Sequence, residues 1–211
     1  QWLGTSTGLL LYSMSADDPA TRQQMHLFKR QRVTGVAIDA RDQIWVSLEK
    51  DGLYILNSTG KVIRTYRRQD SLLYTRGILS LFCDSKNRII VCTERGYYIF
   101  RSPDQWESFY QGPDKPQPTG WYTLTVYEDR NHHLWFCKHL GVDRLDEDLQ
   151  PVQQIESGTT RSPIRRSIVT ACTEDTQGRI WLATLNAGIY LYDQRIVRQY
   201  TITEGLAANA V

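Results

Sequence analysis

The sequence predicts an all-β protein, a β-propeller of four-stranded antiparallel blades, and the strongest sign is an internal repeat. A large apolar residue recurs every 43 to 46 residues along the whole chain, at positions Trp2, Trp45, Ile90, Trp135 and Trp181. In the four complete copies an Asp lies six residues before this position, and a Gly lies six or seven residues after it. A spacing of this size that varies only slightly is the signature of a repeat architecture.

The length of the repeat is the second observation. Four strands of roughly 5 residues, joined by connections of about 4 to 6 residues, total about 40 to 45 residues. In the second copy we expect the four strands at 33–38, 43–47, 52–56 and 62–66. The fourth strand recurs in the other copies, at 25–28, 106–110, 151–155 and 196–200.

The polarity of the expected strands is the third observation. First strands such as 78–83 and 168–172 are apolar almost throughout, which is typical of a strand covered on both faces. Fourth strands such as 62–66 carry charge, as an exposed outer edge should. Because no single blade buries its own faces, stability must come from blades stacking on one another.

An Asp heads the turn between the first and second strands of each complete copy, at Asp39, Asp84, Asp129 and Asp175. An Asp in this place can accept hydrogen bonds from backbone amides two residues further on. These residues recur in every unit, whereas a catalytic acid is needed once or twice. We therefore expect a structural role for them.

The repeat divides the chain into a partial blade and four complete ones. Residues 1–30 form a blade that lacks its first strand and has a polar insertion at 13–24. Complete blades follow at 31–75, 76–120, 121–166 and 167–204, and residues 205–211 begin another. These last residues could close a five-bladed ring. We favour part of a seven- or eight-bladed ring. Closing five blades would require a first strand and a turn ahead of Gln1, and the sequence stops at Val211 before supplying them.

The composition excludes several classes of function. Lys plus Arg number 25 and Asp plus Glu 23, and this balance argues against a general role on nucleic acids or membrane surfaces. No apolar run approaches the roughly 20 residues that span a bilayer, and no signal peptide is visible. No Gly-rich phosphate loop occurs, and we expect no cofactor.

Four cysteines fall in expected strands: Cys83 and Cys172 in first strands, Cys92 and Cys137 in second strands. Cys92 and Cys137 occupy the same repeat position in adjacent blades, which is too far apart for a disulfide. We therefore expect free thiols that behave as small apolar side chains.

The repeat resembles that of a known family. Asp-x-x-Gly-x-Ile-Trp-Leu-x-Thr with Gly-Ile-Tyr-Leu-Tyr at 175–192, and Gly-Leu-x-x-Asn-x-Val at 205–211, resemble the two-component regulator propeller repeat. The weakest copies are 78–100, where Ile90 replaces Trp, and 123–145, where Val-Asp-Arg replaces the aromatic run.

The resemblance implies the periplasmic sensor region of a bacterial hybrid two-component system histidine kinase of the inner membrane. In that family, propellers precede a β-sandwich, a membrane helix and a cytoplasmic kinase, and the sensors typically respond to oligosaccharides from complex glycans. The implied partners are an oligosaccharide, the adjoining propeller and β-sandwich domains, and a second copy in a homodimer. The kinase activity belongs to the parent protein, and no catalytic residue is expected in this segment.

A ligand is expected at the channel mouth, where loops entering first strands and loops joining second to third strands open on one face. An aromatic face for the apolar side of a sugar ring, with polar groups for its hydroxyls, makes such a site. Trp121 with Tyr122 is the first choice, and Arg76 with Lys138 and His139 is the second. The full set is Gln31, Arg76, Trp121, Tyr122, Lys138, His139, Ser167, Asn186 and Asn209.

Other interpretations of these loops stay open. The same residues could be solvated or could contact an adjoining propeller, and Arg161, Arg165 and Arg166 could form a solvated basic loop or favour an acidic glycan. A protein-interaction scaffold is not separated from a sensor by sequence.

Catalysis and metal binding are weaker alternatives. A five-bladed glycoside hydrolase needs two carboxyl groups about 5 to 10 Å apart across the channel, and a propeller lyase is a related alternative. The first strands offer no acid before their last residues, Glu128 and Glu174, and the turn aspartates. His132 and His133 are expected at the opposite end of the blade from Cys137 and His139, so no metal site is predicted.

Overall fold

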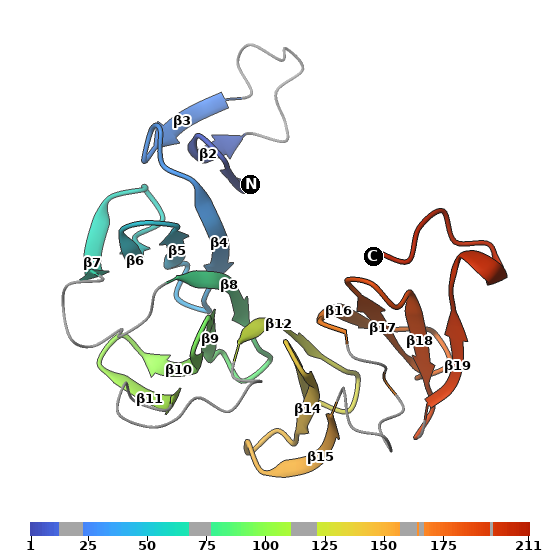
Figure 1. The fold of residues 1–211 in the computed structure, drawn as a ribbon. Coiled ribbons are helices and arrows are strands. Elements are labelled where there is room, and N and C mark those ends of the chain that lie inside the picture. Colours follow the sequence, from blue (N-terminus) through green and yellow to red (C-terminus); the bar gives the residue numbers. More distant parts are fainter. Residues whose placement is uncertain (13–22, 68–76, 111–121, 157–163, 165–166, 195) are drawn as a thin grey trace. The chain divides into compact units, whose positions relative to one another are not determined.

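The computed structural model describes residues 1–12, 23–67, 77–110, 122–156, 164, 167–194 and 196–211. In these ranges the chain forms five antiparallel sheets, and the strands of each sheet lie in chain order (Figure 1). This arrangement confirms the predicted blades. No helix in the described ranges is long and apolar enough to cross a membrane.

The first two sheets cover the partial copy and the first complete copy. The first holds β1 (Trp2–Thr5), β2 (Gly8–Tyr12) and β3 (Gln23–Leu27). The second holds β4 (Val33–Ile38), β5 (Ile44–Leu48), β6 (Gly52–Leu56) and β7 (Val62–Arg67).

Each of the remaining three sheets has four strands. The third sheet holds β8 (Ile78–Cys83), β9 (Ile89–Thr93), β10 (Gly96–Ser102) and β11 (Gln105–Tyr110). The fourth holds β12 (Thr123–Glu128), β13 (Leu134–Lys138), β14 (Gly141–Leu145) and β15 (Pro151–Glu156). The fifth holds β16 (Val169–Glu174), β17 (Ile180–Thr184), β18 (Ile189–Tyr192) and β19 (Ile196–Tyr200), and a short 3-10 helix, η1 (Ile202–Glu204), follows it.

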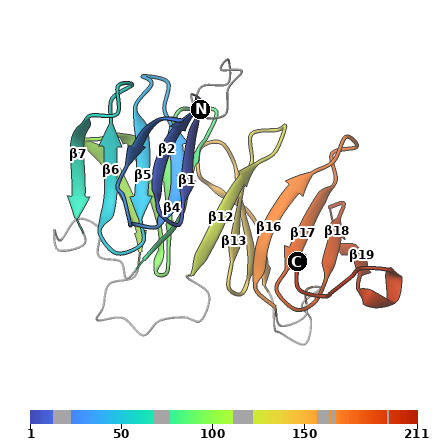
Figure 2. The ribbon, with the colours of Figure 1, turned by 90° about the horizontal axis from the view of Figure 1, so that it is seen from above.

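The chain divides into two compact units, Gln1–Phe109 and Tyr110–Val211, which we call unit 1 and unit 2. Within unit 2, β12 and β13 lie beside β16 (Figure 2). Within unit 1, β4 contacts β8 in the same way. Each unit therefore contains neighbouring sheets that pack face to face, as the repeat requires.

Burial is greatest in the second and third strands rather than in the first strands. Every residue of β5 and β9 is buried, whereas β4 and β16 contain half-buried and exposed residues. The expectation that first strands are covered throughout was wrong. The first strand is an edge strand with a hydrogen-bonded neighbour on one side only, whereas the second strand is flanked on both sides.

Aromatic side chains fill the space between neighbouring sheets of each unit. In unit 1 the Trp45 and Phe100 rings lie 5.3 Å apart in an edge-to-face arrangement. In unit 2 the Trp135 and Tyr192 rings lie 5.5 Å apart in the same arrangement. The repeating Trp of one blade therefore packs against the third strand of the next, which links the sequence period directly to blade stacking.

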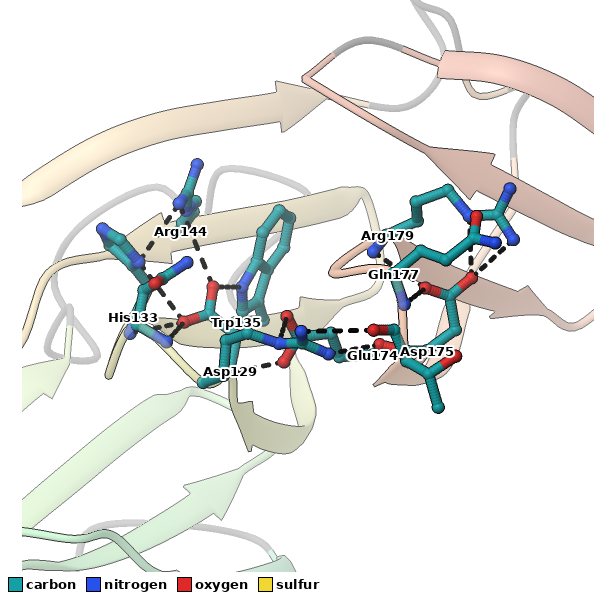
Figure 3. Close-up of polar contacts among 11 residues, drawn as sticks. Asp129, His133, Trp135, Arg144, Glu174, Asp175, Gln177 and Arg179 are labelled. Atoms are coloured by element: carbon teal, nitrogen blue, oxygen red, sulfur yellow. Dashed lines mark hydrogen bonds and ion pairs between the residues drawn. The ribbon is translucent and has the colours of Figure 1, made fainter.

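Each repeat Asp that precedes a Trp closes its turn with one carboxylate. In Asp129, Oδ1 accepts from the backbone N–H groups of Asn131 and His133, both at 2.9 Å, and Oδ2 accepts from Trp135 Nε1 at 2.8 Å (Figure 3). The same three kinds of bond form at Asp39 and Asp175. The predicted bonds to backbone amides are thus confirmed, and the bond to the indole explains the fixed six-residue spacing.

The copy without a Trp uses a different donor. Asp84 Oδ1 accepts from the Arg88 backbone N–H at 2.7 Å, and Oδ2 accepts from Arg88 Nε at 2.5 Å. The side chains of Arg88 and Asp84 are only 6% and 1% exposed. A buried guanidinium therefore replaces the indole that Ile90 cannot supply.

Acid should weaken unit 2 through Asp129. Burial raises the pKa of this carboxyl, but the hydrogen bonds from Trp135, His133 and Asn131 and the nearby His133 charge lower it more, so its pKa lies below the usual value. A lowered folded-state pKa contributes stability that is present above the unfolded-state pKa, near 4, and is lost as the pH falls through the folded-state value. We expect the free energy of unfolding, measured in urea between pH 7 and pH 2, to fall below about pH 4. Asp129→Asn should flatten this dependence, and an unchanged acid slope in that variant would contradict the assignment.

Candidate ligand-binding site

Several of the predicted site residues lie outside the described residues: Arg76, Trp121, Arg161, Arg165 and Arg166. Gln31 belongs to unit 1, where it is exposed ahead of β4 and its backbone N–H donates to Phe28 O at 3.0 Å. The other six predicted residues belong to unit 2 and can be compared with one another.

Tyr122 and His139 meet at one end of the β12–β15 sheet. The backbone N–H of His139, in the β13–β14 hairpin, donates to Tyr122 O at 2.9 Å, just before β12. Their ring centroids are 6.4 Å apart, with an angle of 61° between the ring planes. His139 is exposed and Tyr122 is half-buried, so two adjacent rings lie at this end of the sheet.

Lys138 forms an ion pair that departs from the repeat. Its Nζ lies 2.5 Å from Asp143 Oδ2, and the two side chains are 15% and 24% exposed. Asp143 Oδ1 is buried and has no hydrogen-bond partner within the described part of the chain. Lys138 ends the second strand where Thr93 and Thr184 stand in other sheets. The pair thus places a carboxylate with spare acceptor capacity next to an ammonium group.

Asp143 was not among the residues predicted from the sequence. It faces Phe136 across the β13–β14 ladder, where Tyr190 faces Leu182 in the next sheet. The signal was present, because Val-Asp-Arg interrupts the aromatic run of the third strand. A departure from a repeat at a half-buried position indicates a local function more directly than the polarity of loops does.

In the β16–β19 sheet, Ser167 and Asn209 form hydrogen bonds with backbone groups of the loops at one end of the sheet. Ser167 is buried, and its Oγ accepts from Asn186 N at 3.3 Å and donates to Ile168 O at 3.5 Å. Asn209 Oδ1 accepts from Ile202 N at 2.9 Å, and Asn209 O accepts from Gly188 N at 2.8 Å. Of the three predicted residues at this sheet end, Asn186 is the exposed one, so its amide can meet a ligand.

The turn end of unit 2, opposite these loops, holds several ion pairs. Arg130 Nε lies 2.6 Å from Glu174 Oε1, and Arg130 Nη2 donates to Asp175 O at 2.5 Å. Figure 3 shows the labelled acids of this end engaged with indole, guanidinium or imidazole groups. Within the described ranges no group of three or more His, Cys, Asp or Glu is placed to hold a metal ion.

No family model and no curated protein matches this sequence. Solved structures do match the fold. The extracellular domain of a proposed hybrid two-component system from B. thetaiotaomicron aligns with a TM-score of 0.74 at 18% identity, covering 99% of this chain and 27% of that one. A second such domain from the same organism aligns with a TM-score of 0.67 at 17% identity, covering 86% of this chain and 24% of that one.

Two other kinds of protein share the fold. PorZ, a surface component of the type-IX secretion system of Porphyromonas gingivalis, aligns with a TM-score of 0.73 at 14% identity, covering 99% of this chain and 33% of that one. Virginiamycin B lyase from Staphylococcus aureus aligns with a TM-score of 0.60 at 12% identity, covering 80% of this chain and 55% of that one.

The chain has the β-propeller fold. It spans about a quarter to a third of the length of the first three solved structures that it matches. Extracellular domains of proposed hybrid two-component systems are among its structural neighbours, in agreement with the resemblance that the repeat motif carries. At sequence identities of 12 to 18%, these likenesses establish the fold only. The function has to be inferred from the residues of the site.

Proposed function

We propose that this chain is the ligand-recognition propeller of a hybrid two-component receptor, lies on the periplasmic side of the inner membrane, and binds an oligosaccharide. The repeat motif, and the extracellular domains of proposed hybrid two-component systems among the structural neighbours, support the assignment to such a receptor. On this proposal the segment is not an enzyme, and the parent protein carries the kinase. The ligand acts by binding one arrangement of the propeller and its adjoining domains better than another.

The paired rings of Tyr122 and His139, next to the Lys138–Asp143 pair, are the observation that carries the proposed ligand. A sugar ring would lay its apolar face on an aromatic ring, and its hydroxyl groups would donate to carboxylate and amide oxygens. The partly exposed Asp143 carboxylate and the exposed Asn186 amide can supply acceptors at this end of unit 2. Because the Lys138 charge is balanced by Asp143, we expect neutral oligosaccharides to bind at least as well as acidic ones.

Calorimetric titration of the 211-residue chain with neutral and acidic oligosaccharides tests this proposal. His139→Ala and Tyr122→Ala should each weaken binding about tenfold, equivalent to about 1.4 kcal/mol. His132→Ala is the matched control, because His132 is also exposed and lies in the hairpin at the other end of β13. Binding that is unaffected by all three substitutions would place the ligand elsewhere.

The lyase neighbour gives the enzyme alternative a specific test. Incubating the chain with each oligosaccharide that binds, followed by product analysis, should return the oligosaccharide unchanged. Turnover of the oligosaccharide would show that the chain is an enzyme rather than a sensor. Absence of binding to every saccharide would favour a protein-interaction scaffold. We further propose contacts with adjoining propeller and β-sandwich domains and a homodimer, which crosslinking of the full-length receptor would reveal.

A further inference from the structure

Two cysteines of unit 2 lie on neighbouring strands, β13 and β16, that pack against each other. Cys137 is fully buried in β13, Cys172 is half-buried in β16, and both pack in the apolar cluster of Trp135 and Tyr190. The neighbouring Cys172 thiol, together with burial, raises the pKa of the Cys137 thiol well above its usual value. Cys92 and Cys137 are too far apart for a disulfide because they occupy equivalent repeat positions, but Cys137 and Cys172 are not equivalent.

The repeat itself brings these two positions together. Ser47 in β5 has the ladder position of Cys137, and Leu81 in β8 has that of Cys172. In unit 1, a Cβ added to Gly35 would lie 3.0 Å from both Ser47 Oγ and Leu81 Cγ. The second strand of one blade and the first strand of the next therefore converge at this point in both units, and in unit 2 both residues are cysteine.

The backbone spacing favours a covalent link. Cα atoms of β13 and β16 come within 8 Å of each other, which is closer than the about 10 Å at which sheets usually stack. A disulfide requires close Cα atoms and Cβ vectors that converge. Cys137 and Cys172 lie on packed strands within one apolar cluster, which brings both side chains into the space between the two sheets.

We propose that Cys137 and Cys172 are a modification site, at which a reversible disulfide joins two adjacent blades. The oxidant is an organic disulfide, RSSR, and the half-buried Cys172 is the accessible thiol. The Cys172 thiolate attacks RSSR, forming a mixed disulfide and releasing one RS⁻. The Cys137 thiolate then attacks Cys172 Sγ and releases the second RS⁻, so two cysteines lose two electrons and RSSR gains them.

Forming this link should change thermal stability. The bond closes a loop that includes the whole of β14 and β15, so it restricts the unfolded chain of unit 2. We expect the melting temperature of oxidised protein to rise by about 5 to 10 °C and to return on reduction. This inference does not depend on the proposed ligand.

The test uses the 211-residue chain, reduced, freed of reductant and then incubated with oxidised glutathione. Denaturation, alkylation with N-ethylmaleimide and mass spectrometry should find two of the four thiols unalkylated, and a peptide map should find Cys137 joined to Cys172. Four alkylated thiols, another cysteine pair, or glutathione retained on Cys172 would each overturn the proposal.

Two variants keep the result interpretable. Cys172→Ser removes a half-buried thiol and should abolish both the linked peptide and the shift in melting temperature. Cys83→Ser, at another half-buried first-strand cysteine, should leave both unchanged. Loss of the linked peptide in Cys83→Ser would also overturn the proposal.

Discussion

Replacing Arg88 with Ala is expected to lower the free energy of unfolding by about 3 kcal/mol or more. Arg88 supplies the only side-chain donor to the Asp84 carboxylate among the hydrogen bonds of the described residues, and both side chains are almost fully buried. Removing the guanidinium leaves a buried charge without a compensating partner, which costs more than the pair itself contributes. Urea unfolding, followed by tryptophan fluorescence and circular dichroism, measures the change.

Arg179→Ala is the matched control for this substitution. Arg179 also donates to a repeat Asp, with Nε 2.8 Å from Asp175 Oδ2, but Trp181 Nε1 donates to the same oxygen at 2.9 Å. The Arg179 and Asp175 side chains are 34% and 21% exposed, so we expect a loss of about 0 to 1 kcal/mol. Equal losses in the two variants would show that the indole does not substitute for the guanidinium.

Gly188→Ala should be similarly damaging, with a loss of about 3 kcal/mol. Gly188 has φ +74°, and an added Cβ would lie 2.0 Å from Tyr200 O in β19. The substitution therefore combines a left-handed backbone with a collision against the backbone of the neighbouring strand, which cannot move without disturbing the β18–β19 ladder.

Gly205→Ala separates these two contributions. Gly205 also has positive φ, at +102°, but nothing lies within 4 Å of an added Cβ. Only the backbone strain remains, and we expect a loss of about 1 to 2 kcal/mol in the same urea experiment. If Gly205→Ala is as damaging as Gly188→Ala, the contact with Tyr200 is not what requires glycine at position 188.

The blades could be predicted from the sequence because the same local chemistry is repeated. An Asp six residues before a Trp specifies a turn, since the carboxylate meets two backbone amides and the indole of one hairpin. The Ile90 copy was recognisable by spacing alone. Its buried ion pair could not be foreseen, because whether Arg88 turns inward depends on the space that the missing indole leaves.

The candidate site was less predictable. Tyr122 and His139 were placed in separate groups from the sequence, and neither their ring contact nor the backbone bonds of Ser167 and Asn209 was predicted. Polar loop residues can serve either a ligand or their own backbone, and only the coordinates show which amides need an acceptor. The placement of Cys137 and Cys172 in one cluster was missed for a related reason, since neighbouring sheets pack through residues at non-equivalent repeat positions.

The turn end of each unit has one further property. The amide that follows the repeat Asp reaches across to the next blade: Ala40 N donates to Asn87 Oδ1 at 2.5 Å, and Arg130 N donates to Glu174 Oε2 at 2.9 Å. Neighbouring hairpins are thereby anchored at that end by bonds from a rigid main chain. If two adjacent blades tilt, they would therefore rotate about these hydrogen-bonded hairpins. The distance between their loops at the opposite end would then change most.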